Sequence, residues 1–320
     1  MDYLLLIVGF VLLIKGADLF VDGASSIAAK LKVPSIIIGL TIVAFGTSAP
    51  EAAVSVTAAL EGNNGIAVGN VIGSNIFNLL FVIGLSAVIR TLPVEKGLFK
   101  KDYPLSILAS VMLAVMAADK LFSGTDNVLS RSDGIMLLLV FCIFLYSTIS
   151  AGLAARKNVS SDISDEDKEK IKKPFWQCIL LTAAGIAGIV IGGDITVNAA
   201  TGIALTFGMS ETLVGLTIVA VGTSLPELVT SVIATKKGEN DLALGNVVGS
   251  NIFNILFILG ISGTINPIAI TADVLADLLI LIAVNIIVFL AIFKERKIRR
   301  PLGVIMLLMY IADMVYAVMR

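Results

Sequence analysis

Long apolar runs, separated by short polar segments, fill the chain from its beginning to its end. Ten of these runs are long enough to cross the roughly 30 Å of a bilayer's hydrocarbon core as helices. They cover residues 3–29, 34–60, 66–89, 103–118, 134–155, 175–206, 212–235, 242–263, 271–293 and 301–319. The pattern predicts an all-α integral membrane protein with ten transmembrane helices. The first run lacks the basic flank and cleavage site of a removable signal, so we expect it to be the first membrane helix.

The positive charges test this count. If the N-terminus lies outside, the loops on the inside hold nineteen of the 23 Lys and Arg residues. The outside segments hold only Lys120, Arg131 and Arg320, and Lys15 lies within the first run. Membrane proteins concentrate Lys and Arg in their cytoplasmic loops. We therefore expect a multi-pass protein of the cell membrane with both termini outside and residues 157–173 in the cytoplasm.

The two halves of the chain are copies of each other. Glu227 follows Glu51 by 176 residues, and Asn254 follows Asn78 by the same 176 residues. Because each copy crosses the membrane an odd number of times, the second copy is inserted upside down, as in many secondary transporters. The sequence thus predicts a five-helix repeat, a cytoplasmic linker and an inverted five-helix repeat, at residues 1–156, 157–173 and 174–320.

Composition narrows the possible functions. The 320 residues are 57% hydrophobic with a net charge of -1, and no segment has the basic excess of a nucleic-acid-binding surface. The chain has no His, which excludes imidazole metal ligands and a Ser-His-Asp triad. Cys142 and Cys178 both lie in apolar runs, so we expect small buried hydrophobic residues rather than a disulfide. No cofactor is expected, and the sequence does not specify an oligomeric state, although a monomer is compatible with it.

One polar motif interrupts the second run of each half. Residues 39–56 read GLTIVAFGTSAPEAAVSV, and residues 215–232 read GLTIVAVGTSLPELVTSV. A Glu in a membrane helix costs about 2.5–3.5 kcal/mol on insertion scales, which makes it a functional candidate. Pro50 cannot donate a backbone hydrogen bond and displaces the carbonyl of Gly46, so we expect a helix break that lines a cavity or is buried in protein.

Hydroxyl and amide side chains accompany each Glu. Thr47 and Ser48 precede Glu51 by four and three residues, a spacing that predicts one shared helical face. The third run of each half adds a second string, GNVIGSNIFN and GNVVGSNIFN, in which a Ser and an Asn four residues apart share a face. Pooled, the two copies provide only hard oxygen ligands, which suit Ca²⁺. The members are Thr47, Ser48, Glu51, Ser74, Asn78, Thr223, Ser224, Glu227, Ser250 and Asn254.

Other polar residues in the runs have less specific interpretations. We expect Asn70 and Asn246 to cap or cross-link helices rather than contact an ion. For Asp18 and Asp194 two interpretations stay open, lining of an ion path or bonding to the backbone near a helix irregularity. Asp313 has no counterpart in register and is expected to be a lone buried or interfacial carboxyl group.

The doubled strings G-T-S-x-P-E and G-N-x-x-G-S-N-x-x-N resemble the α-repeats of the sodium/calcium exchangers, a family of the cation/Ca²⁺ exchanger superfamily, and especially its short prokaryotic members. The resemblance covers essentially the whole chain. It implies ten helices, a central diamond of ion sites, and exchange of several Na⁺ for one Ca²⁺.

The resemblance also implies roles for matching residues. Glu51 and Glu227 would bridge Ca²⁺ together with the carbonyls of Thr47 and Thr223. Na⁺ would be bound by two flanking sets, with Asn78 and Asn254 between them: the Ala44 carbonyl, Ser74 and Ser224, and the Ala220 carbonyl, Ser250 and Ser48. Many members carry Asp where this chain has Asn254, which leaves the ion stoichiometry and K⁺ co-transport open.

We therefore expect an antiporter that exchanges Na⁺ for Ca²⁺ by alternating access, with the two ions as substrates and the bilayer as its surroundings. A Ca²⁺/H⁺ or K⁺-dependent exchanger on the same scaffold is the first alternative, although the proton-coupled branch typically has other strings. A passive cation channel with a ring of Glu is a second alternative. An intramembrane hydrolase that uses the two carboxylates is a remote third.

Overall fold

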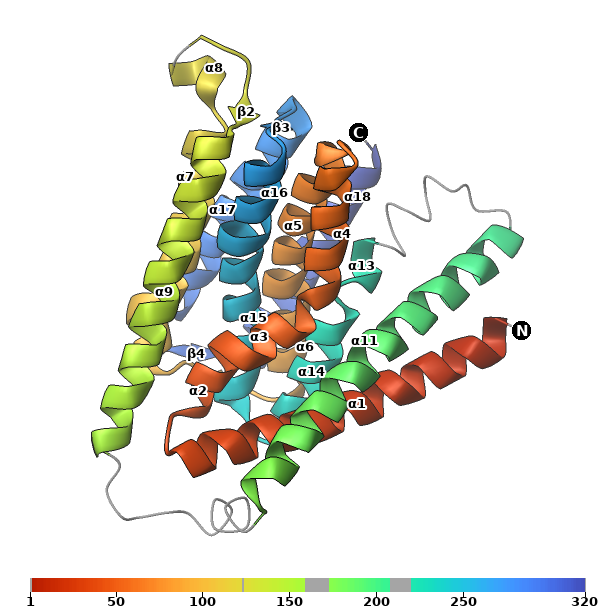
Figure 1. Cartoon of the computed structure of the whole chain (residues 1–320), viewed down its shortest axis with the longest axis vertical. Helices are drawn as coiled ribbons and strands as arrows, with labels where there is room; N and C mark the ends of the chain where they lie inside the picture. Colours follow the sequence, from red (N-terminus) through yellow and green to blue (C-terminus); the bar gives the residue numbers. More distant parts are fainter. Residues whose placement is uncertain (1, 123, 159–172, 208–219, 320) are drawn as a thin grey trace.

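The computed structural model describes residues 2–122, 124–158, 173–207 and 220–319. Helices dominate both halves (Figure 1). Short π-helical segments, named η in the text, adjoin several of them. The elements of the first half are α1 (Asp2–Leu31), α2 (Ser35–Ile38), η1 (Gly39–Val43), α3 (Ala44–Thr47), α4 (Ala49–Leu60), α5 (Asn64–Ile76), η2 (Phe77–Val82), α6 (Ile83–Ile89), β1 (Leu92–Pro93), η3 (Leu98–Asp102), α7 (Tyr103–Met116), α8 (Asp119–Phe122), β2 (Val128–Leu129) and α9 (Arg131–Asn158). Those of the second half are α11 (Phe175–Thr206), α13 (Ala220–Gly222), α14 (Leu225–Lys236), α15 (Asn240–Phe253), η5 (Asn254–Ile258), α16 (Leu259–Ile265), β3 (Ile268–Ala269), α17 (Ala272–Ile292), β4 (Lys297–Ile298) and α18 (Arg300–Met319).

Seven helices in the described part of the chain are long and apolar enough to cross a membrane. The pair 35–47 and 49–60, bent by 51°, makes an eighth span if it is counted as one. Of the two other predicted spans, residues 103–118 correspond to the 14-residue α7, and residues 212–235 begin outside the described residues. The helical multi-pass class is confirmed, and the number ten and the inverted repeats stay predictions. Most of the predicted linker, residues 159–172, lies outside the described part.

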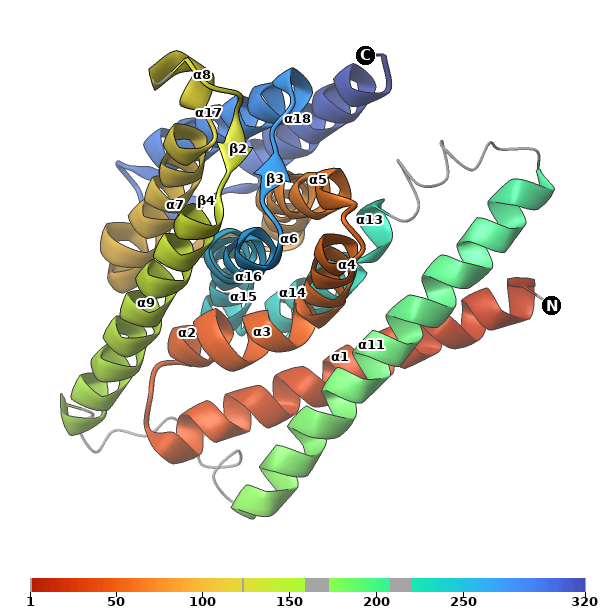
Figure 2. The ribbon, with the colours of Figure 1, turned by 45° about the horizontal axis from the view of Figure 1, so that its top comes forward.

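The hydrophobic interior is divided into two clusters. The larger cluster joins helices from both halves but contains no residue of α1 or α11. The smaller cluster joins α1 and α11 to parts of α2, α14 and α15. Figure 2 shows α1 and α11 side by side along one flank of the bundle. The fold therefore consists of a central bundle and a separately packed helix pair.

Glycines bring α1 and α11 into backbone contact. Gly9, Gly16 and Gly23 recur at every seventh residue of α1, and Gly185 and Gly192 have the same spacing on α11. A Cβ atom on Gly185 would lie 2.6 Å from the Phe20 backbone nitrogen, which leaves no room for any side chain. We call these five residues the glycine seam. Small residues at such positions allow close packing of membrane helices.

The closing elements of each half pair with the other half. β1 pairs with β4, and β2 pairs with β3, each as a two-stranded antiparallel sheet. Gly84 of α6 faces the backbone of Gly303 on α18, and its counterpart Gly260 of α16 faces Gly134 on α9. Neither half therefore completes its own packing.

The structure corrects the prediction for one cysteine. Cys178 is buried as predicted, but Cys142 is exposed. It lies on α9, whose large apolar side chains Leu139, Ile143 and Tyr146 are also exposed. In a membrane protein an apolar run does not reveal which helix face is buried, because the lipid-facing side is apolar as well.

We predict that Gly185→Ala destabilises the protein, because the new methyl group would overlap the backbone of α1. Overpacking typically costs about 1–3 kcal/mol. Gly193→Ala is the matched control on the same helix, since its Cβ would meet no atom closer than 3.8 Å. Thermal unfolding in detergent should give a lower midpoint for Gly185→Ala only. Equal midpoints for the two variants would contradict the close contact.

Candidate cation site

Each GTSxPE motif lies at a helix break, as the sequence predicted. Ser48 leaves the helical conformation between α3 and α4, with φ -84° and ψ 10°, and Pro50 lies in the first turn of α4. Ser224 has the same role before α14, with φ -92° and ψ 6°, and Pro226 follows it. At each break Pro opens a new helix whose first turn carries the Glu.

Each carboxylate is bound by a hydroxyl group from the opposite half. Ser48 Oγ donates to Glu227 Oε1 at 2.7 Å, and its counterpart Ser224 Oγ donates to Glu51 Oε1 at 2.9 Å. All four side chains are 0% exposed. The two GTSxPE motifs thus form one site across the two halves.

The Ser residues of the second string join this site. Ser250 Oγ lies 3.4 Å from Glu227 Oε1 and 3.5 Å from the Ala44 carbonyl oxygen. Ser74 Oγ lies 3.0 Å from Ser224 Oγ, next to Glu51. The structure therefore brings together the predicted Ser, Glu and Ala44 groups.

Thr47 and Thr223 bond to the opposite half, where the helical spacing suggested a face shared with the local Glu. Thr47 Oγ1 donates to Asn246 Oδ1 at 3.0 Å, and Thr223 Oγ1 donates to Asn70 Oδ1 at 3.3 Å. The break after Thr47 explains the difference, because the helix does not continue unchanged from Thr47 to Glu51. Ala220 is the first residue of α13.

Asn70 and Asn246 cross-link helices, in agreement with the structural role that we predicted. Asn246 Nδ2 donates to Ser231 Oγ at 2.9 Å and to the Glu227 carbonyl at 3.5 Å. Asn70 repeats this arrangement with Ser55 Oγ at 3.0 Å and the Glu51 carbonyl at 3.4 Å. Each Asn thus fixes the backbone of a Glu and binds a Thr of the opposite half.

Asn78 and Asn254 lie in π-helical segments that the sequence analysis did not predict. Asn78 is in η2 and Asn254 begins η5, and both are 0% exposed. A π-helical turn changes which side chains share a face, and such turns are frequent at functional sites. The regular helical spacing of Ser74 and Asn78 is therefore an incomplete guide to their positions.

Sequence reasoning also missed four buried polar residues that lie close to the two motifs. Ser55 and Ser231 receive the asparagine cross-links, and Asn75 and Asn251 bond to each other's backbone carbonyls. The signal was present in the sequence, because each of these pairs is separated by the same 176 residues as the Glu pair.

Asp18 does not lie near a helix irregularity, and its lining of an ion path stays a prediction. Its carboxylate pairs with Lys237 beside α14, and α1 is unbroken around it. Asp194 is exposed on α11. Asp313 takes part in an interaction, so the expectation of a lone carboxyl group is wrong.

A multi-span helical protein with paired, buried, oxygen-only groups at two helix breaks falls in the class of ion-transporting membrane proteins. The family profile described as sodium/calcium exchanger protein matches residues 1–150 and 178–319. The chain therefore belongs to the sodium/calcium exchanger family.

Individual relatives are similar over nearly their whole length. The putative antiporter CaxA of Alkalimonas amylolytica is 42% identical, with 95% of each chain covered. The sodium/calcium exchanger MaX1 of Methanosarcina acetivorans is 33% identical, with 98% of this chain and 97% of the relative covered. A structure of the sodium-calcium exchanger NCX_Mj soaked with 10 mM Na⁺ and zero Ca²⁺ superposes with a TM-score of 0.83 at 33% identity, and 98% of each chain is covered. These findings confirm a membrane transporter rather than an enzyme and support cation/Ca²⁺ antiport.

We predict that Asn246→Leu lowers stability by about 1–3 kcal/mol, because Ser231 and Thr47 lose a buried partner. Asn285→Leu is the control, since that buried amide donates to the Leu281 carbonyl of its own helix. Thermal unfolding in detergent compares the two variants. A drop no larger for Asn246→Leu than for the control would argue against a cross-link between the halves.

Proposed function

We propose that this protein is a secondary active antiporter that exchanges Na⁺ for Ca²⁺ by alternating access, and that Glu51 and Glu227 coordinate the ions near the bilayer midplane. The family membership supports the class of transport. The arrangement of the buried oxygens supports the site.

One observation carries the proposal. Glu51 Oε2, Glu227 Oε2, Asn78 Oδ1 and Asn254 Oδ1 are buried and have no hydrogen-bond partner among the described residues. An unpaired carboxylate oxygen is costly in a low-dielectric interior unless a cation compensates it. Unpaired oxygens on both carboxylates and on both central amides therefore favour a bound cation.

The donor set favours Ca²⁺ and Na⁺. Ca²⁺ takes six to eight oxygen ligands and accepts carboxylates, amides and carbonyls. No group of three or more His, Cys, Asp or Glu side chains gathers in the described part of the chain, so neutral oxygens would complete the coordination. In our proposal the Thr47 and Thr223 carbonyls join the two Glu at Ca²⁺. Na⁺ binds at flanking sets that contain Ala44, Ser74 and Ser224, and Ala220, Ser250 and Ser48, with Asn78 and Asn254 between them.

Charge neutralisation explains why transport would be an exchange. Two buried carboxylates without a cation carry a charge that the protein cannot move through a low-dielectric region at low cost. Binding of Ca²⁺, or of several Na⁺, cancels that charge and permits the change of access. The same two Glu residues cannot serve both full sets of ions at once, so the ions alternate.

We assign the change of access to the helix pair α1 and α11. These two helices are absent from the larger hydrophobic cluster and belong to the smaller one, which they share with parts of α2, α14 and α15. Such a division favours movement of the pair against the bundle. In this proposal both termini lie outside and residues 157–173 lie in the cytoplasm, as the loop charges indicate.

We predict that Glu51→Gln and Glu227→Gln each reduce Na⁺-gradient-driven ⁴⁵Ca²⁺ uptake into proteoliposomes to below about a tenth of wild type. A charge-assisted interaction is worth about 1.5–3 kcal/mol, or roughly ten- to hundredfold. Glu61→Gln is the matched control, because Glu61 is exposed at the end of α4. Normal uptake by either site variant would refute the assigned roles.

The same assay separates the alternatives. Uptake that requires K⁺ on the Ca²⁺ side indicates a K⁺-dependent exchanger, and uptake driven by a proton gradient alone indicates Ca²⁺/H⁺ exchange. Flux without any counter-ion on the opposite side indicates a channel.

A further inference from the structure

The buried amide of Asn75 lies where the two halves meet and bonds to the second half. Its Nδ2 donates to the Asn251 carbonyl at 3.1 Å, and Asn251 Nδ2 donates to the Asn75 carbonyl at 3.2 Å. Its Oδ1 accepts from Asn254 Nδ2 at 3.0 Å. The exposed fraction of all three residues is at most 3%.

These bonds fix the orientation of the Asn75 amide. Rotation by half a turn would place Oδ1 against the Asn251 carbonyl oxygen and Nδ2 against Asn254 Nδ2, so both contacts would become repulsive. Asn75 Oδ1 is therefore a fixed acceptor. Residue 254 must present a donor to it, which an amide can do and an ionised carboxylate cannot.

We propose that Asn75 is a positioning residue for the cation site. It holds the NH₂ group of Asn254, so that the Asn254 Oδ1 atom, which has no partner among the described residues, is presented to the cation. It also disfavours an ionised carboxylate at position 254, because that group has no hydrogen to donate. This inference rests on the proposed function, because it assigns a supporting group to the same site.

The corresponding contact of the other half is not made. The register of the repeats would join Asn78 Nδ2 to Asn251 Oδ1, and both atoms are buried without a hydrogen-bond partner in the described part of the chain. Asn251 contributes a similar bond between the halves but no bond to Asn78 or Asn254. It is therefore a matched control for Asn75.

We expect Asn75→Ala to raise the KM for Ca²⁺ in proteoliposome uptake about five- to tenfold, with a smaller change in maximal rate, as for loss of one buried hydrogen bond. Asn251→Ala should stay within about twofold of wild type. In a double-mutant cycle, Asn75→Ala should add less than about twofold to Asn254→Ala, because the two residues act as a unit.

Equal KM increases in Asn75→Ala and Asn251→Ala would overturn the inference and indicate a purely structural contact. Multiplicative effects in the cycle would also overturn it. If wild-type protein shows no Na⁺-driven uptake, the proposed function fails instead. The same cycle is then measured by Ca²⁺-dependent thermal stabilisation in detergent, with the same criteria for the role of Asn75.

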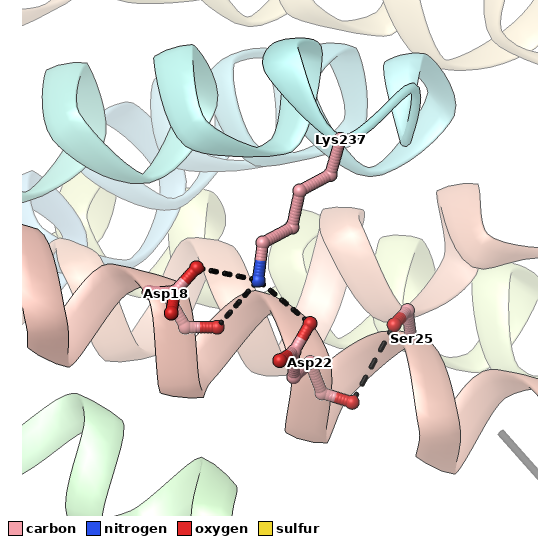
Figure 3. Close-up of polar contacts among 4 residues, drawn as sticks. All are labelled: Asp18, Asp22, Ser25 and Lys237. Atoms are coloured by element: carbon pink, nitrogen blue, oxygen red, sulfur yellow. Dashed lines mark hydrogen bonds and ion pairs between the residues drawn. The ribbon is translucent and has the colours of Figure 1, made fainter.

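A separate observation concerns the contact between α1 and α14 (Figure 3). Lys237 Nζ lies 2.6 Å from Asp18 Oδ1, 2.7 Å from Asp22 Oδ1 and 3.1 Å from the Asp18 carbonyl oxygen. Partial burial alone would lower the pKa of Lys237, but the hydrogen bonds to the two Asp residues outweigh it and raise the pKa. Lys237 is therefore charged at neutral pH.

The duplicated half does not repeat this ion pair. The counterpart of Lys237 in register is Glu61, and that of Asp18 is Asp194, so the basic residue is replaced by an acidic one. In addition, α1 packs against α14, whereas α11 makes no comparable contact with α4 among the described residues. Both the charges and the helix packing therefore favour a contact between α1 and α14, and neither favours the corresponding contact between α11 and α4.

We infer that Lys237, Asp18 and Asp22 form an ion-pair latch that holds α1 against α14 at one end of the helix pair only. The latch favours closure at that end, and its breakage accompanies opening there. Because the three side chains are partly exposed, its contribution is modest, and it biases the two access states without preventing exchange.

Cysteine labelling tests the latch without reference to transport. Ala234→Cys, in a Cys142→Ser and Cys178→Ser background, places a thiol at a site that is 0% exposed in the cluster shared by α1 and α14. We expect Lys237→Met to raise the rate of maleimide labelling about two- to fivefold, as for loss of a partly exposed ion pair. Lys236→Met, which removes a neighbouring exposed charge, should leave the rate unchanged.

Equal labelling rates in the two Lys variants would overturn the latch. If the Ala234→Cys protein does not fold, amide hydrogen exchange of residues 18–25 replaces the label. Faster exchange in Lys237→Met than in Lys236→Met supports the latch, and equal exchange refutes it.

Discussion

Two carboxylates buried inside a membrane protein are the constraint on which the remaining structure depends. Glu51 and Glu227 each accept their shortest hydroxyl hydrogen bond from the opposite half, from Ser224 and Ser48 respectively. The asparagine cross-links then fix the backbone of each Glu from the same half and a Thr from the other. A single half would leave its Glu without these partners, so the site requires both copies of the repeat.

The packing separates the parts that must stay fixed from the parts that can move. Asn78 and Asn254 lie near residues of the larger cluster, and Asn254 takes part in a hydrogen bond between the halves. Glu227 lies on α14, which packs against both clusters. The α1 and α11 pair packs in a different cluster and touches the broken helices from one side. Precise ion coordination needs rigid ligands, and access needs movement. In the proposed transport cycle these two demands would fall largely on different clusters, with α14 packed against both.

Much of the site could be predicted because its motifs occur twice in the chain, in register. The paired Glu, Ser and Asn residues and the breaks at Pro50 and Pro226 follow from motifs in register. Helix spacing failed where the helix is irregular, at Ser48 and in η2 and η5. The exposure of Cys142 could not be predicted, because lipid and protein interior are both apolar. The pairing of Lys237 with α1 joins residues more than two hundred positions apart, and only the folded chain shows that contact.

The glycine seam has a mechanical consequence. Two helices that touch backbone to backbone have no long side chains between them that could bend and absorb a displacement, so a force on one helix is transmitted to the other. If α1 tilts, α11 tilts with it as one rigid body. The two ends of the pair then move in opposite directions relative to the bundle, so they cannot both move away from it at once. Such a linkage would exclude a continuous pore in any position of the pair, and so protect an ion gradient from leakage.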